Sequence, residues 1–307
     1  MMCESPVTIV IPVRDRATIV GRTLDSVAAQ TARPLRVVLV DNGSSDSTLA
    51  VLEKWRTANL SDDFDIKVIS EPRPGAAVAR NAGLELVATE WTMYFDSDDV
   101  MAPGHVRQAL DFVRIHPDAD IVGWDVLMHL TGEKKVKKFT TADAYYNCVM
   151  HGTMGTQRYM CRTELLRKAG GWNNSLSTWD DIELGVRMLN LSPRIRKRSG
   201  VPTVDIYASA DSITGSSFTS RLGHEIRAIE EIRRNLPDDK KMIADMKLAV
   251  LAGDCAHEGC CEAKQLLDAR MMDLSPAHRH LLRAVYYYKS KGLRGVVTLA
   301  RPFLYML

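Results

Sequence analysis

The sequence of 307 residues has no long apolar run: none reaches the roughly 18 residues that a membrane-spanning helix needs. The amino terminus also has no basic segment ahead of its first apolar run, which contains Pro12 and stops at Arg14. This pattern is a poor signal peptide and a good first strand. We therefore expect a cytoplasmic protein.

The chain also lacks a large excess of positive or negative charge, and its cysteines form no regular framework. The formal net charge is +2, whereas a dedicated nucleic-acid binder is usually more basic, with its charge clustered on one face. The six cysteines follow no regular spacing, and we expect reduced thiols. Cys255, His257, Cys260 and Cys261 do not match a zinc-binding pattern, so buried thiols in a helix are expected there.

A glycine-rich dinucleotide fingerprint is also absent after the first apolar run, which argues against a dinucleotide oxidoreductase. What is present is a regular alternation. Short β-branched runs at 7–13, 35–41, 66–71 and 91–96 are typical of buried strands, and helical spacing is found at 16–30, 46–55 and 75–87. The alternation predicts an α/β fold with a mostly parallel central sheet flanked by helices.

The remainder of the chain is mixed and then helical. A strand is expected at 120–130, an exposed basic hairpin arm at 134–139, and helices at 163–172 and 180–189. From about residue 216 the pattern is helical, with breaks expected at Pro237, Gly253 and Pro276.

The segment MYFDSDDV places Asp96, Asp98 and Asp99 at the end of a predicted strand. Carboxylates this close raise one another's pKa unless a cation or hydrogen-bond donors offset the repulsion. An acidic turn that caps the next helix is the simpler interpretation. However, Asp41 ends another strand, and ligands of parallel sheets bind at the carboxyl ends of the strands. A site for Mg²⁺ or Mn²⁺, which prefer carboxylate oxygens, is therefore favoured.

Charged residues in two further segments have either a structural or a functional interpretation. Arg80 lies in a helix of small residues; it points either to water or, because such a helix packs closely, toward a phosphate. Thr178 to Asp181 fits a capping box at a helix start. The alternative is that Asp181 is a general base facing the ligand edge of the sheet.

Five segments occur in an order and spacing that resembles the family-2 glycosyltransferases of the GT-A fold: VTIVIPVRDR, VVLVDNGSSDST, RPGAAVARNAGLELV, MYFDSDD and GGWNNSLSTWDDIELGVRM. The resemblance covers about residues 5–215. It implies a GT-A, Rossmann-like domain at 1–215, with a nucleotide-binding half at 1–100 and an acceptor and catalytic half at 101–215. Residues 216–307 form a helical C-terminal region. The implied activity is inverting transfer from a nucleotide-diphosphate sugar.

The resemblance implies roles for individual positions in the nucleotide pocket. The residues that it assigns to the donor are Pro12, Val13, Arg14, Asp41, Arg80, Asp96 and Ser97. Asp41 would contact the base, and Asn42 stands where a second aspartate is frequent. Arg14 and Asp15 depart from the family pattern, in which an aromatic residue or asparagine usually follows the Pro-Val pair.

The resemblance also implies a metal site and a base. Asp96 and Asp98 match the DXD motif, with Asp98 as the more direct ligand of Mn²⁺ or Mg²⁺, and Asp181 matches the catalytic base. Asp180 stands where glutamate is usual. Downstream, Ala208 and Ala210 replace basic residues of a family motif that contacts the diphosphate or metal.

The implied donor is UDP-linked, and the implied acceptor is a hydroxyl of a glycan or lipid-linked molecule, as in polysaccharide biosynthesis at the cell envelope. The carboxyl-terminal segment LRGVVTLARPFLYML is basic and then apolar. It is either a packed helix or a peripheral contact with the inner face of a membrane.

Two alternatives stay open at this point. One is a catalytically degenerate glycosyltransferase fold that serves as a binding module. The altered Arg14 and Ala208 positions keep this alternative open, but the retained acids argue against it: Asp41, Asp96, Asp98 and Asp181. The other is a phosphatase of the haloacid-dehalogenase type with Asp96 as the nucleophile. That motif normally lies on the first strand of its domain, whereas here it follows the fourth.

Overall fold

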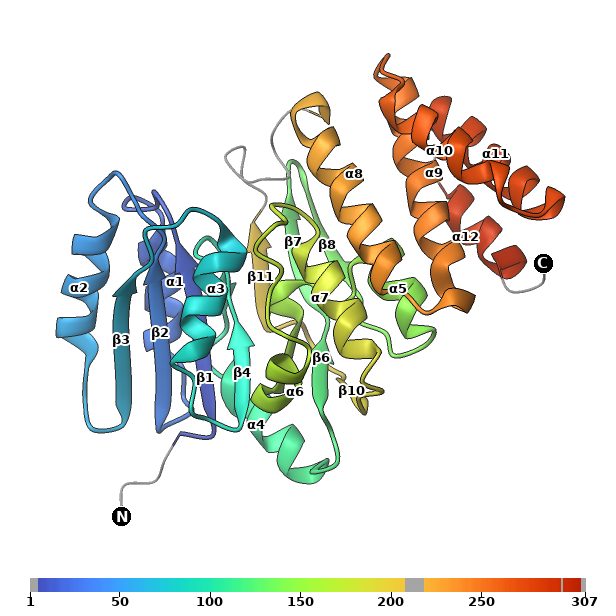
Figure 1. Cartoon of the computed structure of the whole chain (residues 1–307). Coiled ribbons are helices and arrows are strands. Elements are labelled where there is room, and N and C mark those ends of the chain that lie inside the picture. The colour runs from blue at the N-terminus through green and yellow to red at the C-terminus, as the bar shows by residue number, and fades with distance from the viewer. Residues whose placement is uncertain (1–4, 208–217, 294, 305–307) are drawn as a thin grey trace.

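The computed structural model describes residues 5–207, 218–293 and 295–304 (Figure 1). A seven-stranded sheet forms its centre, with the strand order β10-β6-β9-β4-β1-β2-β3. The strands are β1 (Val7–Val13), β2 (Leu35–Asp41), β3 (Phe64–Ser70), β4 (Trp91–Tyr94), β6 (Ile121–Trp124), β9 (Tyr159–Arg162) and β10 (Ile195–Arg198). All neighbours are parallel except β9, which runs antiparallel to β4 and β6. The predicted α/β class and mostly parallel sheet are confirmed.

A second, four-stranded sheet has the order β5-β11-β7-β8 and consists of β5 (Val100–Met101), β7 (Val126–Leu130), β8 (Glu133–Lys137) and β11 (Val204–Tyr207). The single strand predicted at 120–130 is wrong in this respect. The chain changes sheet at Asp125, whose carboxylate accepts the backbone N–H of Phe139 and pairs with Lys197. The hairpin arm predicted at 134–139 is confirmed as β8, which pairs with β7.

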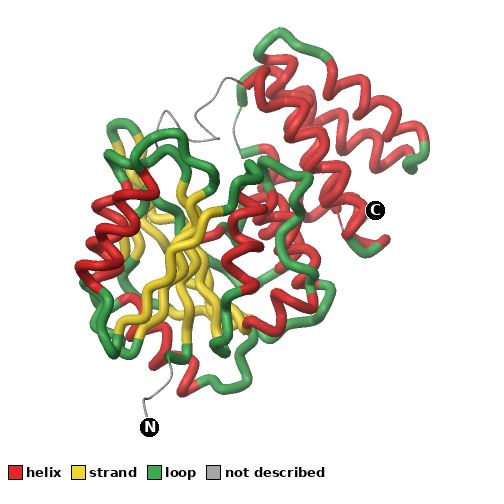
Figure 2. The backbone as a smooth tube through the Cα atoms, turned by 60° about the vertical axis from the view of Figure 1, so that its left-hand side comes forward, coloured by secondary structure: helices red, strands yellow, loops and turns green. Residues whose placement is uncertain are grey.

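Seven α-helices precede residue 208 in the described chain: α1 (Val20–Ala28), α2 (Thr48–Asn59), α3 (Ala76–Glu85), α4 (His105–Ile115), α5 (Ala144–His151), α6 (Thr163–Lys168) and α7 (Asp180–Leu189). Successive side chains of a strand point to opposite faces of its sheet. Accordingly, Val10 of β1 packs in the core with α3 and α7, whereas Ile9 and Ile11 pack with α1 and α4. Figure 2 shows the sheet between these layers.

The small residues of α3 let this helix approach the sheet closely, as their abundance in the sequence predicts. A Cβ atom on Gly83 would lie 2.4 Å from a methyl group of Val10, so no larger side chain fits there without displacement. Because α3 starts at the carboxyl edge of the sheet, Arg80 in its second turn comes close to the ends of β1 and β4.

The C-terminal helices are α8 (Phe218–Asn235), α9 (Lys241–His257), α10 (Glu262–Met272), α11 (Pro276–Ser290) and α12 (Val296–Ala300). The helix boundaries predicted at Pro237 and Pro276 are confirmed, but the break predicted at Gly253 is wrong. Gly253 lies inside α9, where a Cβ atom would come within 2.8 Å of the Tyr286 carbonyl oxygen of α11. Glycine is required at that position for helix contact. No helix among the described residues is both long and apolar enough to cross a bilayer.

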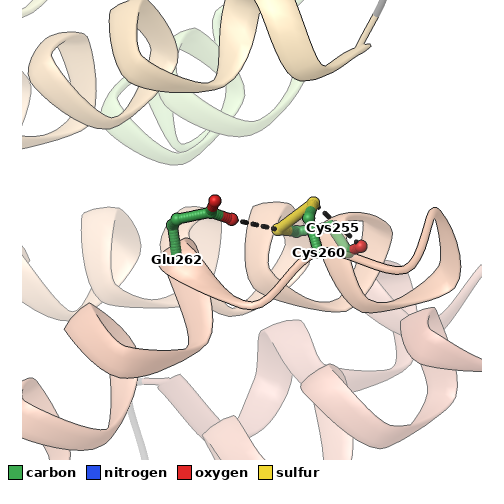
Figure 3. Close-up of side chains that lie close together, drawn as sticks. All are labelled: Cys255, Cys260 and Glu262. Carbon is green, nitrogen blue, oxygen red and sulfur yellow. Dashed lines mark hydrogen bonds between the residues drawn. A yellow bond between two sulfur atoms is a disulfide. The ribbon is translucent and has the colours of Figure 1, made fainter.

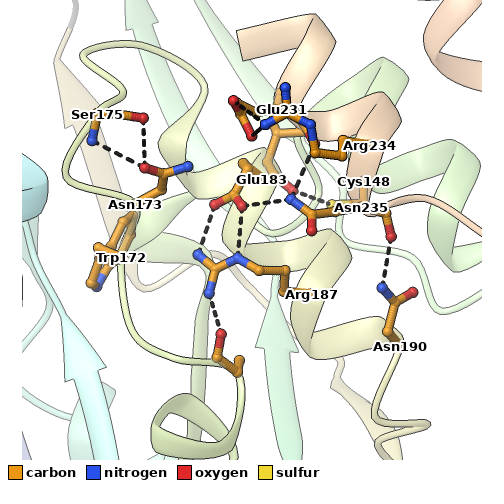
Figure 4. Close-up of polar contacts among 12 residues, drawn as sticks. Cys148, Trp172, Asn173, Ser175, Glu183, Arg187, Asn190, Glu231, Arg234 and Asn235 are labelled. Atoms are coloured by element: carbon orange, nitrogen blue, oxygen red, sulfur yellow. Dashed lines mark hydrogen bonds and ion pairs between the residues drawn. The ribbon is translucent and has the colours of Figure 1, made fainter.

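A polar network joins α7 to the C-terminal helices (Figure 4). The buried Glu183 accepts two hydrogen bonds from Arg187, each 2.7 Å long, and a third from the Asn235 amide of α8 at 3.0 Å. The Asn190 amide donates to the backbone carbonyl of Asn235. Since Asp180 and Asp181 begin α7, this network couples their position to α8.

The prediction of buried free thiols at Cys255, Cys260 and Cys261 is wrong: two of the three are bridged, and Cys261 is free but exposed. Cys255 and Cys260 form a disulfide, because the left-handed turn at Gly259 folds Cys260 back onto the last turn of α9 (Figure 3). The ligand atoms of Glu262 and the two cysteines lie within 4.8 Å of one another, but disulfide sulfurs are not the thiolates that a zinc site uses. Cys148 and Cys161 are buried free thiols, as expected.

Candidate active site

The carboxyl ends of β1, β2 and β4 meet at one edge of the central sheet, as the alternation predicts. A cavity of about 600 Å³ opens there; we name it the strand-end cavity. Seven of the predicted site residues line it: Pro12, Val13, Arg14, Arg80, Asp96, Ser97 and Asp98. Asp181 lines a second cavity of about 630 Å³, which we name the helix-side cavity. The two cavities share Arg80, Asp96 and Ser177.

The turn after β1 is fixed by the turn after β2. Asp15 adopts a left-handed backbone conformation with a φ of 50°, and its carboxylate accepts hydrogen bonds from the backbone N–H and the hydroxyl of Ser45. The Asp15 backbone N–H in turn donates to the Ser44 hydroxyl at 3.0 Å. The departure from the family pattern at this position therefore has a structural role: it holds Arg14 at the rim of the strand-end cavity.

Asp41 lies at the end of β2, opposite Val13 in the strand register. Its side chain is buried, and its Oδ1 atom has no hydrogen-bond partner among the described residues. A buried carboxylate oxygen without a donor is unfavourable unless a ligand supplies one. Asp41 lines neither cavity, although the next residue, Asn42, lines the strand-end cavity.

Asn42 follows Asp41 and holds the loop that leads into α3. Its amide donates to the backbone carbonyls of Glu71 and Arg73, at 3.1 and 2.7 Å, and its carbonyl oxygen accepts the N–H of Gly75. An aspartate, which cannot donate when ionised, would lose the first two of these bonds. The asparagine at this position thus positions the start of α3.

Arg80 joins two acids that are distant in the sequence. Its guanidinium donates to Asp96 at 3.0 Å and to Asp180 at 2.9 Å, and it lies 4.4 Å from the centre of the Trp172 ring. The residue is only 7% exposed. Burial opposes its charge, but Asp180 and Asp96 outweigh that effect and raise the pKa of Arg80. Of the two interpretations of Arg80, an outward-pointing side chain is wrong.

Replacing Arg80 with alanine is expected to lower the free energy of unfolding by about 3–5 kcal/mol, since it leaves Asp96 and Asp180 facing each other without a cation. Replacement with lysine keeps the charge but not the forked geometry, and should recover only part of the loss. Urea unfolding of the three proteins measures both effects. Wild-type stability in the alanine variant would contradict the bridging role.

Gln157 organises the aspartates after β4. Its amide nitrogen donates to Oδ2 of Asp96 and to Oδ2 of Asp99, each at 2.5 Å. Asp99 points into the protein, where its other oxygen accepts the N–H of Tyr207. Burial, together with Asp96, raises the pKa of Asp99 to about 8. Unlike Asp96 and Asp98, Asp99 therefore does not line the strand-end cavity.

Asp98 has the opposite environment. It lines the strand-end cavity, and no other described residue donates a hydrogen bond to its carboxylate. Burial and the nearby charge of Asp96 raise its pKa. A divalent cation would offset this repulsion, and Mg²⁺ or Mn²⁺ in proteins is commonly held by one or two carboxylates plus the phosphates of a substrate. Asp98 and Asp96 therefore fit such an ion.

Asp181 lies at the start of α7, but not in the capping box that the sequence suggests. Trp179, in a left-handed conformation with a φ of 53°, is the residue before the helix, and no side chain caps it. Asp181 accepts the N–H of Ile182 and forms no ion pair with a described residue. Burial, followed by the charge of Asp180, raises the pKa of Asp181 to about 6.

Several residues of the site were missed by sequence reasoning. Gln157 lies in none of the five sequence motifs, and Trp179 lies in the fifth without a role assigned to it. Lys247 lies in α9, 4.3 Å from the Trp179 ring, and lines the helix-side cavity with Lys137 of β8. The signal that could have identified Lys247 is the presence of a lysine within the apolar stretch MKLAVLAG. Ala208 and Ala210, by contrast, lie outside the described residues.

The fold is similar to those of known glycosyltransferases. Staphylococcus aureus TarS 1-349 in complex with UDP-GlcNAc aligns with a TM-score of 0.67 at 18% identity, over 97% of this chain and 92% of TarS. The mannosyltransferase PcManGT from Pyrobaculum calidifontis, in complex with GDP-Man and Mn²⁺, aligns with a TM-score of 0.57 at 18% identity, over 93% of this chain and 86% of that one. These similarities confirm the predicted GT-A fold.

Curated relatives are similar over part of their length. A pre-mycofactocin glycosyltransferase of Mycobacterium tuberculosis is 28% identical over 206 residues, which is 62% of this chain and 40% of the relative. A PGL/p-HBAD biosynthesis glycosyltransferase of Mycobacterium bovis is 30% identical over 125 residues, 40% of this chain and 48% of the relative. The chain thus spans less than half of the length of these relatives.

The family described as Glycosyl transferase family 2 matches residues 8–165. This range, just over half of the chain, contains the strand-end carboxylates Asp41, Asp96 and Asp98 together with Arg80 and Gln157. The family that the five sequence motifs predict is confirmed. The chain belongs to glycosyl transferase family 2.

Proposed function

We propose that the protein transfers a sugar from a nucleotide-diphosphate donor, UDP-linked, to a hydroxyl of a glycan or lipid-linked acceptor, with inversion at the anomeric carbon. The observation that carries this proposal is the Arg80 bridge. By binding Asp96 and Asp180 at once, Arg80 brings the strand-end carboxylates and the start of α7 together at the wall between the two cavities.

The strand-end cavity suits the nucleotide diphosphate. The unpartnered Oδ1 of Asp41 would accept an N–H of the base, and Pro12, Val13 and Arg14 would line the nucleoside. Asp98 and Asp96 would hold Mn²⁺ or Mg²⁺, which supplies a Lewis acid for the charge on the leaving diphosphate. UDP-GlcNAc bound to TarS, and GDP-Man with Mn²⁺ bound to PcManGT, support this assignment.

The helix-side cavity suits the acceptor, with Asp181 as the base. A general base works best when its pKa lies close to the operating pH, and burial brings Asp181 toward that range. Arg80 donates to Oδ2 of Asp180 at 2.9 Å, so this oxygen is already engaged by a hydrogen bond, whereas Asp181 forms no ion pair with a described residue. Asp181 would therefore remove the proton from the acceptor hydroxyl as that oxygen attacks the sugar.

A panel of UDP- and GDP-sugars, assayed for nucleoside-diphosphate release with Mn²⁺ and with EDTA, tests the proposal. Release with Mn²⁺ alone is expected for at least one donor. Tight UDP binding without release by any donor would instead support the binding-module alternative. The phosphatase alternative has little support, because the chain matches glycosyl transferase family 2 over residues 8–165 and Asp96 follows β4 rather than the first strand.

Peripheral contact with a membrane remains part of the proposal for the C-terminal segment. Its basic and apolar residues are partly used inside the protein: Arg301 pairs with Asp143 at 3.1 Å, and Val296 and Leu304 are buried. Arg294 lies outside the described residues. Leu299 and Phe303, however, are 73% and 51% exposed on one end of the molecule.

If these two side chains enter a lipid surface, replacing both Leu299 and Phe303 with serine should reduce flotation with anionic liposomes. The burial of two large apolar side chains is worth about 1.5–3 kcal/mol each, so the reduction should be large. Replacing the exposed Leu60, which follows α2, and the exposed Ile115, which ends α4, serves as the control. Equal flotation of all three proteins would show that the segment does not bind the membrane.

A further inference from the structure

The helix-side cavity contains two lysines from distant parts of the chain. Lys137 comes from β8 and Lys247 from α9, and both line this cavity together with Asp181. Arg158 disfavours the charged form of Lys137, and Asp181 favours it. For Lys247, Asp181 and then Glu225 favour the charged form, and Lys137 disfavours it. Among the described residues, neither lysine forms an ion pair with a carboxylate. Positive charge therefore accumulates around the proposed base.

The other basic groups of the cavity do not supply a free cation. Arg158 donates to the backbone carbonyls of Gly152 and Lys138, at 2.7 and 2.6 Å, so its guanidinium holds the backbone of the cavity wall together. Burial lowers the pKa of His151, and Lys247 and Lys137 lower it further, so this imidazole is neutral at neutral pH. The two lysines are therefore the cations available to a ligand.

Burial makes these ammonium groups unfavourable in this place, and no carboxylate of a described residue pairs with either of them directly. Burial is the main cause that lowers the pKa of both lysines, and it brings that of Lys247 to about 8. The charge of Asp181 offsets part of this effect for both lysines, and Glu225 and the ring of Trp179, 4.3 Å from the Lys247 ammonium, do so for Lys247. Methionine or glutamine would fill the same wall without the cost, which indicates that the charges serve a ligand.

The position of the lysines indicates which ligand. Neither lines the strand-end cavity, where the proposed function places the nucleotide diphosphate. Both lie beside Asp181, where the acceptor hydroxyl would be deprotonated. We propose that the acceptor carries an anionic group, a phosphate or a carboxylate, next to its reacting hydroxyl, and that Lys137 and Lys247 bind this group. The inference rests on the proposed function and deepens it.

The test uses three probes of similar size: glycerol, glycerol 3-phosphate and glycerate. Each is titrated into the full-length protein saturated with UDP and Mn²⁺, so that the strand-end cavity is filled, and binding is followed by NMR. The anionic probes are expected to bind and glycerol is not. The double variant Lys137→Gln, Lys247→Gln should bind them at least about tenfold more weakly, as expected when charge-assisted hydrogen bonds are lost.

The double variant Lys134→Gln, Lys135→Gln is the matched control, because it removes two charges from the same hairpin at positions that do not line the cavity. It should bind the probes as the wild type does. The double variant Lys137→Arg, Lys247→Arg keeps the charges and should retain most of the binding, which separates loss of charge from loss of folding. A preference for glycerol 3-phosphate over glycerate would identify phosphate as the group, and the reverse would identify carboxylate.

The inference is wrong if the wild type shows no preference for the anionic probes, if the Lys137→Gln, Lys247→Gln variant binds them equally well, or if the control variant loses as much binding. A parallel fall in UDP affinity would assign the lysines to the donor diphosphate and would also overturn it. Failure of the wild type to bind UDP would contradict the proposed function alone, because the dependence of the anionic probes on the two lysines can be measured without UDP.

Discussion

Replacing Asp181 with asparagine is expected to lower kcat by a factor of about 100 or more, while UDP affinity changes little. Asparagine keeps the shape and the hydrogen bond to the Ile182 N–H, but it cannot accept a proton at neutral pH. The residue lines the helix-side cavity and makes no contact with the strand-end carboxylates. Turnover with saturating donor, measured beside UDP titrations, separates the two effects.

The same substitution should leave the melting temperature unchanged or raise it. Burial and Asp180 raise the pKa of Asp181 to about 6, so the folded protein binds this proton more tightly than the unfolded chain does. The contribution of Asp181 to stability is therefore greatest below its ordinary pKa of 3.8 and is lost as the pH rises through about 6. Asparagine removes that penalty at pH 7. A lower melting temperature with normal turnover would mean that Asp181 only supports the helix.

Asp180→Asn gives the matched comparison at the next position. It removes one of the two carboxylates bound to Arg80, so we expect a lower melting temperature as well as slower turnover.

For the wild type, kcat should rise with pH and level off above about pH 6, because the base must be ionised. The rise should disappear from the residual activity of Asp181→Asn. A wild-type profile that is flat between pH 5 and pH 8, or an unchanged profile in the variant, would contradict the role of Asp181 as base.

Replacing Asp98 with asparagine is expected to abolish most of the gain in UDP affinity that Mn²⁺ provides, a loss of at least about tenfold. Few protein ligands hold such an ion, and Asp98 is the carboxylate of the strand-end cavity that no other described residue engages by a hydrogen bond. Calorimetric titration of UDP with Mn²⁺ and with EDTA measures the difference. The fold should persist, because burial and Asp96 already raise the pKa of this group and disfavour its charge.

Asp62→Asn, an exposed acid in the turn before β3, is the control for the loss of one negative charge. It should keep the full effect of Mn²⁺. In EDTA, all three proteins should bind UDP with the same low affinity. If Asp98→Asn keeps the same metal dependence as the wild type, the ion is held elsewhere and the assignment of this carboxylate is wrong.

The parts of this site that follow from local sequence were predictable. Alternation of strands and helices places the ends of β1, β2 and β4 at one edge, so Asp41 and Asp96 had to fall near each other whatever the rest of the chain does. The same periodicity identifies α3 and α7 as helices with Arg80 and Asp181 on them. These predictions needed no long-range contact.

The remaining parts depend on contacts between distant segments. Arg80 and Asp180 are 100 residues apart, and nothing near either one indicates that they pair. Lys247 reaches the helix-side cavity only because α9 packs against the first 207 residues, a placement that helical periodicity does not specify. The break at Asp125 was hidden for a similar reason: 120–130 is continuously strand-like, and only the second sheet divides it.

The central claim, direct displacement at the anomeric carbon by a hydroxyl that Asp181 activates, has one most direct test. Water can replace the acceptor, so the anomeric form of the sugar first released from a UDP-α-sugar in the presence of Mn²⁺ can be followed by NMR before it equilibrates. The account predicts Mn²⁺-dependent release of the β anomer, and a strongly reduced rate in Asp181→Asn. Release of the α anomer, or an undiminished rate in that variant, would contradict it.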